Sequence, residues 1–183
     1  MPRVTLVGVL AADMTLFYPD FHSTERTFQL LTQVAGRAGR GETPGEVLIQ
    51  TYDPDHYVLK SVAAHDDAGF YRQELLSRSM LQCPPYTHLM QILISGKEED
   101  KLIAAAARLH EILSYYGRGR DYVLLGPAPA ELGRIDNVFR WKLMIRHTNE
   151  DKLIAYSNYC LDKFQAENHQ VSVASDLNPV HMY

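Results

Sequence analysis

Cysteine is scarce in this chain of 183 residues, which contains only Cys83 and Cys160. Two cysteines so far apart form neither a disulfide framework nor the paired spacing of a zinc site, and this scarcity is typical of a reducing compartment. The eight histidines add no H-x-x-H or cysteine-paired spacing. We therefore expect a cytoplasmic protein whose sequence here supplies no metal site.

Long hydrophobic runs are also missing. No stretch of about 18 apolar residues occurs, so a membrane span is not expected, and the N-terminus lacks the charged and apolar regions of a signal peptide. An excess of positive charge is absent too, because the formal net charge is −4. If nucleic acid is a partner, the basic residues that bind it must be concentrated locally.

The sequence contains no G-x-x-x-x-G-K-[ST] motif and no recognisable acidic Walker B-type motif. It therefore lacks the glycine-rich loop and the lysine that hold nucleotide phosphates in P-loop enzymes. This absence excludes a complete ATP site of that type within these 183 residues.

The first 65 residues predict a small parallel α/β unit. Residues 5–10 (TLVGVL) are continuously apolar, which is typical of a strand buried on both faces of a parallel sheet. A helix capped by Ser23 or Thr24 follows, and residues 45–51 (GEVLIQT) predict a second strand. One βαβ crossover is too little for a domain, so we expect neighbouring elements upstream. Residues 53–65 are expected to form a linker or docking segment.

Residues 66–183 predict a second domain with the order β-α-β-β-α-β, preceded by a helix over 68–81. The expected strands are 88–96, 122–125, 138–147 and 170–174, and the expected helices are 98–116 and 149–165. This order is that of the ferredoxin-like, split-βαβ pattern, in which both helices cover one face of a four-stranded sheet. The predicted class is therefore α/β, a parallel βαβ unit followed by an α+β domain whose other sheet face is open.

The most specific motif is residues 33–40, QVAGRAGR. Arg37 and Arg40 lie three residues apart at the end of a helix, and each follows a glycine, Gly36 or Gly39. One guanidinium group can bind two phosphate oxygens at once, and glycine lets the backbone approach the ligand closely. An arginine so placed can stabilise charge on a transferred γ-phosphate. The alternative without function is a glycine-rich helix end with two solvated arginines. This alternative is less favoured because Gln33 and an apolar helix precede the motif and a strand follows it.

QVAGRAGR resembles motif VI of superfamily 2 helicases. The longer stretches VTLVGVLAADMTLFYPDF and ERTFQLLTQVAGRAGRGETPGEVLIQTYDPDH are similar to the end of the second helicase lobe of the replication-restart helicase family, the PriA or primosomal protein N-prime family. FYRQELLSRSMLQCPPYTHLMQILISGK, LLGPAPAELGRIDNVFRWKLMI and SDLNPV resemble that family's C-terminal domain, which is similar to a small-subunit ribosomal protein. The resemblance covers nearly the whole chain.

The resemblance implies roles for particular residues. Residues 4–16 match motif V, whose Asp13 would face the ATP cleft, together with Gln33, Gly36 and Gly39. Arg37 and Arg40 would supply half of an ATP–Mg site whose other half belongs to an upstream lobe. The family's zinc-binding cysteines would also lie upstream. We therefore expect an ATP-dependent helicase of primosome assembly and fork restart, of which these residues alone are inactive.

A basic strand offers a local nucleic-acid surface. Residues 138–147 alternate, so that Arg140, Lys142 and Arg146 share one face with Met144, and Arg134 lies in the preceding hairpin. Such a row could follow a phosphate backbone, with tyrosines nearby to stack on bases. An ordinary solvent-facing strand carries similar residues, so both interpretations remain open.

The resemblance further implies single-stranded and forked DNA, the acidic tail of the single-strand DNA-binding protein and other primosome proteins as partners. Residues 149–152 (NEDK) depart from the family, which often has basic and glutamine residues there, and their acidic charge would repel such a tail. The rival hypothesis is a stand-alone nucleic-acid- or protein-binding module of ferredoxin-like fold without catalysis, in which residues 1–65 form a docking arm.

Overall fold

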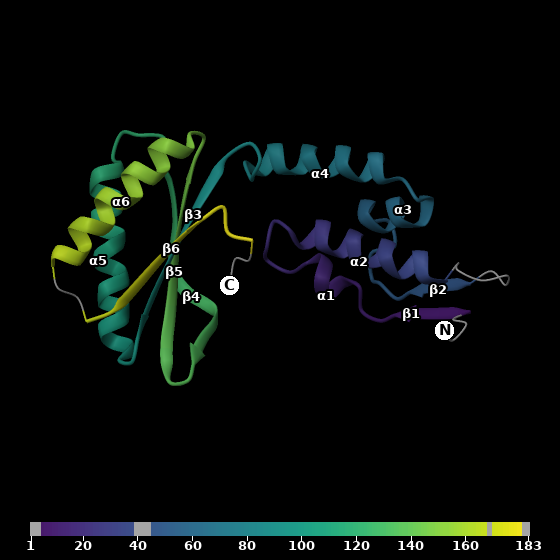
Figure 1. Cartoon of the computed structure of the whole chain (residues 1–183), viewed down its shortest axis with the longest axis horizontal. Helices are drawn as coiled ribbons and strands as arrows, with labels where there is room; N and C mark the ends of the chain where they lie inside the picture. Colours follow the sequence, from purple (N-terminus) through teal and green to yellow (C-terminus); the bar gives the residue numbers. More distant parts are fainter. Residues whose placement is uncertain (1–4, 39–44, 168–169, 181–183) are drawn as a thin grey trace. The chain divides into compact units, whose positions relative to one another are not determined.

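The computed structural model describes residues 5–38, 45–167 and 170–180 (Figure 1). The chain divides into two compact units, Met1–Leu81 and Gln82–Tyr183. We predicted the division at residues 65–66. It falls later because the helix α4 (Asp67–Leu81) packs on the helices that precede it, with Phe70 in the core of the first unit.

Unit 1 contains the predicted parallel βαβ crossover. Strands β1 (Leu6–Val9) and β2 (Glu46–Ile49) pair in parallel, and helix α2 (Ser23–Ala38) connects them, after the short helix α1 (Asp13–Leu16). Val9 and Ile49 pack towards the core, whereas Leu6 and Leu48 on the opposite face are 56% and 55% exposed. The expectation of strands buried on both faces is therefore wrong for the described residues, because apolar side chains cover only one face.

Helix α3 (Tyr57–Ala64) occupies the segment that we predicted as a linker. The ring nitrogen Nδ1 of His56 accepts a hydrogen bond from the amide of Val58 and so caps the helix. The side chains of Val58, Leu59 and Val62 are buried. Eight residues are too few for helical periodicity to stand out in the sequence.

The core of unit 1 forms where α2, α3 and α4 meet. The rings of Phe28 and Phe70 stack with their centroids 3.9 Å apart and an angle of 1° between their planes. Leu31 and Val58 are fully or almost fully buried beside them. This packing buries one face of α2. The described residues of the predicted motif lie further along the same helix and are not part of this core.

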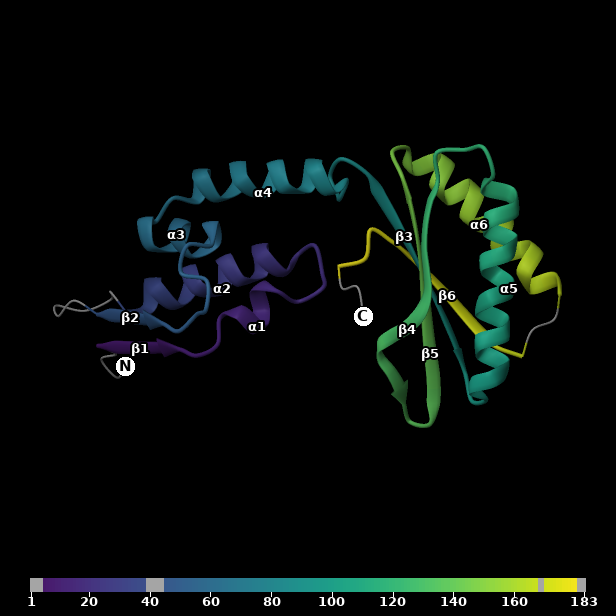
Figure 2. The same cartoon turned by 180° about the vertical axis from the view of Figure 1, so that it is seen from behind.

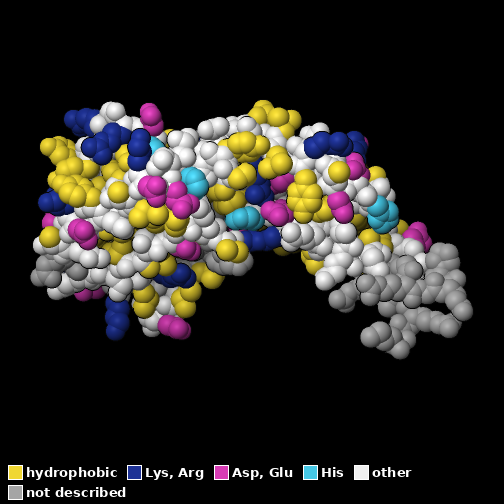
Figure 3. Space-filling view, turned by 45° about the horizontal axis from the view of Figure 1, so that its top comes forward, with side chains coloured by type: hydrophobic (Ala, Val, Ile, Leu, Met, Phe, Trp, Pro, Cys, Tyr) yellow, Lys and Arg dark blue, Asp and Glu magenta, His cyan; other side chains and the backbone are white. Residues whose placement is uncertain are grey.

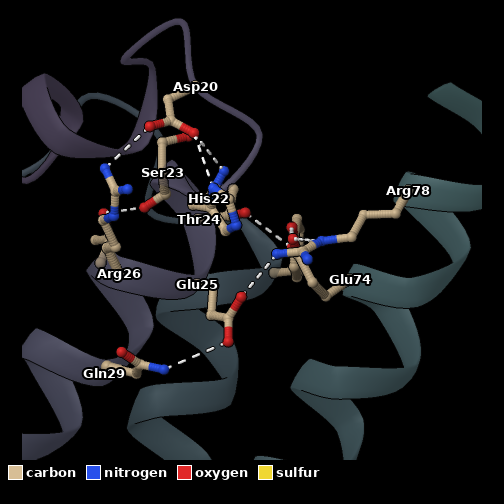
Figure 4. Close-up of polar contacts among 11 residues, drawn as sticks. Asp20, His22, Ser23, Thr24, Glu25, Arg26, Gln29, Glu74 and Arg78 are labelled. Carbon is tan, nitrogen blue, oxygen red and sulfur yellow. Dashed lines mark hydrogen bonds and ion pairs between the residues drawn. The ribbon is translucent and has the colours of Figure 1, made fainter. Parts of the chain in front are cut away.

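A network of buried ionic groups joins α2 to α4 (Figure 4). The carboxylate of Glu74, which is only 4% exposed, accepts hydrogen bonds from the hydroxyls of Thr24 and Tyr57 and from Arg78 at 2.8, 2.6 and 2.7 Å. Arg78 also binds Glu25 at 2.8 Å. Partial burial disfavours the charged form of Arg78 and so lowers its pKa. The two carboxylates have the larger combined effect, and the pKa of Arg78 is raised. The network therefore pairs the buried carboxylate of Glu74, while Arg78 and Glu25 stay partly exposed.

A second cluster fixes the loop before α2. The buried carboxylate of Asp20 binds Arg26 at 3.0 Å and accepts a hydrogen bond from the amide of His22 at 2.9 Å. Asp20 also contacts the His22 ring, but burial outweighs this contact and lowers the pKa of His22. The hydroxyl of Ser23, one of the two predicted cap residues, donates to the carbonyl of Leu16 and ties α2 to α1, and that of Thr24, the other, donates to Glu74.

Unit 2 has the predicted order β-α-β-β-α-β. Its elements are β3 (His88–Gly96), α5 (Glu99–Gly117), β4 (Val123–Ile135), β5 (Val138–His147), α6 (Glu150–Ala166) and β6 (Ser172–Leu177). The sheet is antiparallel in the order β4-β5-β3-β6. Helices α5 and α6 lie on the same side of it, as both views show (Figures 1 and 2). The mixed α/β class is confirmed.

The core of unit 2 lies between the helices and one face of the sheet. Fully buried side chains from β3, β5, α5 and α6 fill it, among them Ile92, Leu109, Leu143 and Leu153. Asn149 caps α6 as predicted, since its side chain accepts a hydrogen bond from the amide of Lys152 at 2.9 Å. Among the described residues, no helix is both long and apolar enough to cross a bilayer.

Strand β4 is longer than predicted. We expected it to end at residue 125, before GPAP, but pairing with β5 resumes after shifts in register between Leu125 and Ala128 and between Pro129 and Arg134. Proline removes a donor from the ladder, which an edge strand tolerates through such irregularities. The last strand, β6, also begins and ends later than predicted, at 172 and 177 instead of 170 and 174.

We predict that Glu74→Ala destabilises unit 1 by about 3–5 kcal/mol, because it leaves the half-buried Arg78 with an incompletely compensated charge. Hydrogen–deuterium exchange of peptides from α2 and α4 measures this as faster exchange. Glu46→Ala, at an exposed position of β2, serves as the control and should stay within about 0.5 kcal/mol of the wild type. Equal exchange in the two variants would contradict a stabilising role for the network.

Candidate functional site

The described part of the predicted nucleotide site lies on α2. Gln33 and Gly36 are exposed and line a hollow of about 520 Å³, together with Phe28, Gln29, Thr32, Asp67 and Tyr71. Among the described residues, a methyl group built on Gly36 would meet no atom within 4 Å outside its own helix and its chain neighbours. The structure thus brings two of the predicted residues together beside open space.

The two predicted arginines are only partly covered by the structure. Arg37 lies in the last turn of α2, one turn after Gln33. Gly39 and Arg40 lie outside the described residues. Their expected contacts with phosphate remain predictions.

Asp13 begins the short helix α1 just after β1, and its carboxylate already has partners. It accepts hydrogen bonds from the hydroxyl of Thr51 at 2.8 Å and from the amide of Tyr52 at 3.1 and 3.2 Å. Desolvation disfavours the charged carboxylate and so raises the pKa of Asp13. The hydrogen bonds together have the larger effect and hold the pKa of Asp13 below its usual range. Asp13 therefore joins α1 to the end of β2, and its predicted contact with nucleotide is untested.

The loop before Asp13 has an unusual backbone. Ala11 adopts a φ of 53°, in the left-handed region that residues other than glycine seldom occupy. The amide of Ala12 donates to the carbonyl of Gln50 at 3.1 Å, which anchors the loop to the chain after β2. Such conformations persist where the surrounding structure imposes them, and they are common at functional loops.

The basic residues of β5 occupy the predicted face of the sheet. Phe139, Trp141, Leu143 and Ile145 belong to the helix-covered core, so the alternation is confirmed. The opposite face is less open than we expected, because Leu89, Gln91 and Met144 are between 5% and 7% exposed. These three residues share that face with Arg146, as the strand register requires.

Three of the four predicted cations have partners within unit 2. Lys142 lies 3.6 Å from the carboxylate of Glu131, and Arg146 donates to the carbonyl of Gln82 at 3.3 Å. Arg134 donates to the side chain of Asn137 at 2.7 Å and lies over the ring of Phe139. The side chain of Arg140 is half-buried. The four basic residues stay positively charged, but the carboxylate of Glu131 offsets part of that charge.

The acidic start of α6 also has local partners. Glu150 lies 2.9 Å from the ring of His88 and 3.3 Å from the side-chain amide of Asn178. Carboxylates in a first turn are favourable for the helix dipole. These contacts give Glu150 a structural role, as the cap of α6 does for Asn149.

Comparison with known proteins identifies relatives of the chain. The family model described as primosomal protein N C-terminal domain matches residues 79–180. The replication restart protein PriA of Bacillus subtilis is 42% identical over 99% of this chain, that of Synechocystis sp. 46% over 84%, and that of Chlamydia muridarum 33% over 98%. These alignments cover 23%, 18% and 24% of the three relatives, so the chain spans about a fifth to a quarter of their length.

Solved structures give only a weak likeness. The designed protein Foldit4 matches with a TM-score of 0.40 and 11% identity, over 52% of this chain and 99% of its own. That score is too low to support an argument about fold or function. The family match and the sequence identities are sufficient in themselves: the chain belongs to the primosomal protein N C-terminal domain family and is related along nearly all its length to replication restart proteins PriA.

Proposed function

We propose that this chain forms the nucleotide-facing end of a second helicase lobe and the C-terminal domain of an ATP-dependent DNA helicase that restarts replication forks. The names of its relatives support the role in replication restart. The observation that carries the proposal is the position of QVAGRAGR, which begins on a helix that connects two parallel strands. Asp13 follows the first of these strands, so both candidate motifs belong to one βαβ unit.

In this proposal, Arg37 and Arg40 act on the phosphates of ATP–Mg bound mainly by another lobe. Arginine stabilises the charge that develops on the transferred phosphoryl group. The open backbone at Gly36 and the exposed side chain of Gln33 leave room for that nucleotide. The network around Glu74 supports the site indirectly, because it holds α2 through α4.

The second unit contributes DNA binding and, we propose, contacts with the single-strand DNA-binding protein and other primosome proteins. Four cations in residues 134–146 provide an electrostatic surface for phosphates, although Glu131 offsets the charge of Lys142. Zinc, expected in the family, would be bound by residues that this sequence does not contain.

We expect no ATP hydrolysis by these 183 residues alone, because they lack a phosphate-binding loop. Phosphate release from ATP–Mg, with and without single-stranded DNA, measures this directly. Turnover above a blank that disappears in the Arg40→Ala variant would contradict the proposal of a half-site.

We expect the Arg140→Ala/Lys142→Ala/Arg146→Ala variant to bind single-stranded and forked DNA more weakly than the wild type. Each lost phosphate contact should lower the slope of log K against log salt by about 0.7. Fluorescence anisotropy between about 50 and 200 mM salt measures both the affinity and the slope. The Glu131→Gln variant should bind DNA more tightly, since it removes the carboxylate beside Lys142.

The exposed cation Lys97, on the same unit, provides the control as Lys97→Ala. If the triple variant and this control bind DNA equally well, the β5 face is not a DNA surface.

A further inference from the structure

A cluster of tyrosines lies at the end of unit 2 where α5 ends and the chain turns towards β4. The tyrosine cluster consists of Tyr115, Tyr116, Tyr122, Tyr156 and Tyr159. It borders two hollows, of about 720 and 580 Å³, which share Tyr116 as a wall. Arginine and lysine side chains gather beside hydrophobic-coloured side chains over this end of the unit (Figure 3).

Local sequence produces the cluster on both helices. On α6, Lys152, Tyr156, Tyr159 and Lys163 follow one another at spacings of four, three and four residues, which places them on one stripe of the helix. The last turn of α5 and the loop after it supply YYGRGRDY, residues 115–122. A methyl group at Gly117 would lie 2.7 Å from the hydroxyl of Tyr156, so glycine permits this close approach of the helices.

The rings fall into a fixed inner part and an exposed outer part. Tyr122 and Tyr156 stack with their centroids 3.9 Å apart, and the hydroxyl of Tyr156 donates to the carbonyl of Leu113. Tyr116 meets Tyr115 and Tyr159 edge to face, with both centroid distances 5.0 Å. Tyr115 and Tyr159 are 67% and 48% exposed, so their surfaces are available to a ligand while Tyr116 positions them.

The charges around these rings are mainly positive. The side chains of Arg118, Arg120 and Lys152 are exposed, and within the described ranges none of them forms an ion pair. Lys163 lies over the ring of Tyr159. The nearby carboxylates of Glu111 and Glu167 are bound by Arg108 at 2.9 and 2.6 Å. Asp121 is the opposing charge that remains in the larger hollow.

We propose that the tyrosine cluster, with Arg118, Arg120 and Lys152, binds single-stranded nucleic acid by stacking bases on Tyr115 and Tyr159. Exposed aromatic rings beside cations are the combination by which proteins bind unpaired strands without reading their sequence. Duplex bases are stacked on each other and cannot use such rings. The proposal rests on the proposed DNA binding of unit 2 and adds to it a surface on the helical layer.

The strand register connects this surface to the basic row of β5. Val123 pairs with Arg146, and Tyr122 immediately precedes Val123. The ring of Tyr122 also lies 4.7 Å from that of His147, the residue after Arg146. The tyrosine cluster and Arg146 therefore lie at the same end of β5 but on opposite faces of the sheet, so a single strand that contacts both must pass around the sheet edge formed by β4.

The test uses the full chain and a fluorescein-labelled oligothymidylate of about 16 nucleotides. Tyr115→Ala/Tyr159→Ala should weaken binding by at least about fivefold, given the usual effect of losing a base-stacking ring. Arg118→Ala/Arg120→Ala should weaken binding and reduce its salt dependence. Tyr86→Ala and Lys97→Ala, at exposed positions of the same unit outside the cluster, should bind as the wild type does.

An abasic oligonucleotide of the same length separates stacking from charge. The wild type should bind it more weakly than oligothymidylate, and the tyrosine double variant should bind the two equally. Photo-crosslinking of an oligonucleotide that carries iodouracil should label residues 115–122 or 156–163. Fluorescence of Trp141, which packs on the core of this unit, checks that each variant is folded.

Several results would overturn the proposal in distinguishable ways. If only the β5 triple variant loses binding, DNA binding by unit 2 stands and the tyrosine cluster has no part in it. If the wild type binds no DNA, both proposals fail. If an acidic peptide binds the wild type but not Arg118→Ala/Arg120→Ala, while neither double variant changes DNA binding, the surface belongs to a protein partner.

Discussion

The burial of one carboxylate, that of Glu74, constrains the whole first unit. Three donors from α2, α3 and α4 converge on it, and its position among them requires these helices to keep one arrangement. Buried charge is costly unless it is paired, so removal of one partner of this contact destabilises the unit more than the intact contact stabilises it. The stacked rings of Phe28 and Phe70 supply the apolar burial beside it. Together they leave the side of α2 with Gln33 and Gly36 uncovered, where the candidate nucleotide site lies.

In the second unit, one face of the antiparallel sheet packs against the helices and the other face carries the basic residues of β5. Each strand places alternate residues against α5 and α6 and the others on the opposite face, which is open only in part because Leu89, Gln91 and Met144 are buried there. On β5 this alternation buries Leu143 and Ile145 and turns Lys142 and Arg146 to the opposite face. The helical layer carries its own charged surface beside Tyr115 and Tyr159. Because the net charge of the chain is −4, the DNA binding that we propose depends on local cationic surfaces of this kind.

Elements with a regular pattern of apolar residues were predictable from sequence. Elements whose stability depends on contacts with residues far away in the sequence were not. Strands β3 and β5 have the predicted bounds because their alternation is regular. Helix α3 was missed because it is short, and its stability depends on packing against α2 and α4. At the candidate sites, the motif at residues 33–40 was evident, but the contacts of Asp13 with Thr51 and of Lys142 with Glu131 depend on tertiary proximity. The tyrosine cluster was not predicted, because it forms only where the end of α5 and the loop after it meet α6 in the folded unit.

The central claim is that the second unit holds DNA while the first presents half of a nucleotide site. Hydrogen–deuterium exchange of the full chain, with and without a saturating single-stranded oligonucleotide, tests it most directly. We expect protection within residues 115–122 and 134–146, and no change in β2. Protection confined to the first unit, or none anywhere under conditions where the oligonucleotide is bound, would contradict the account.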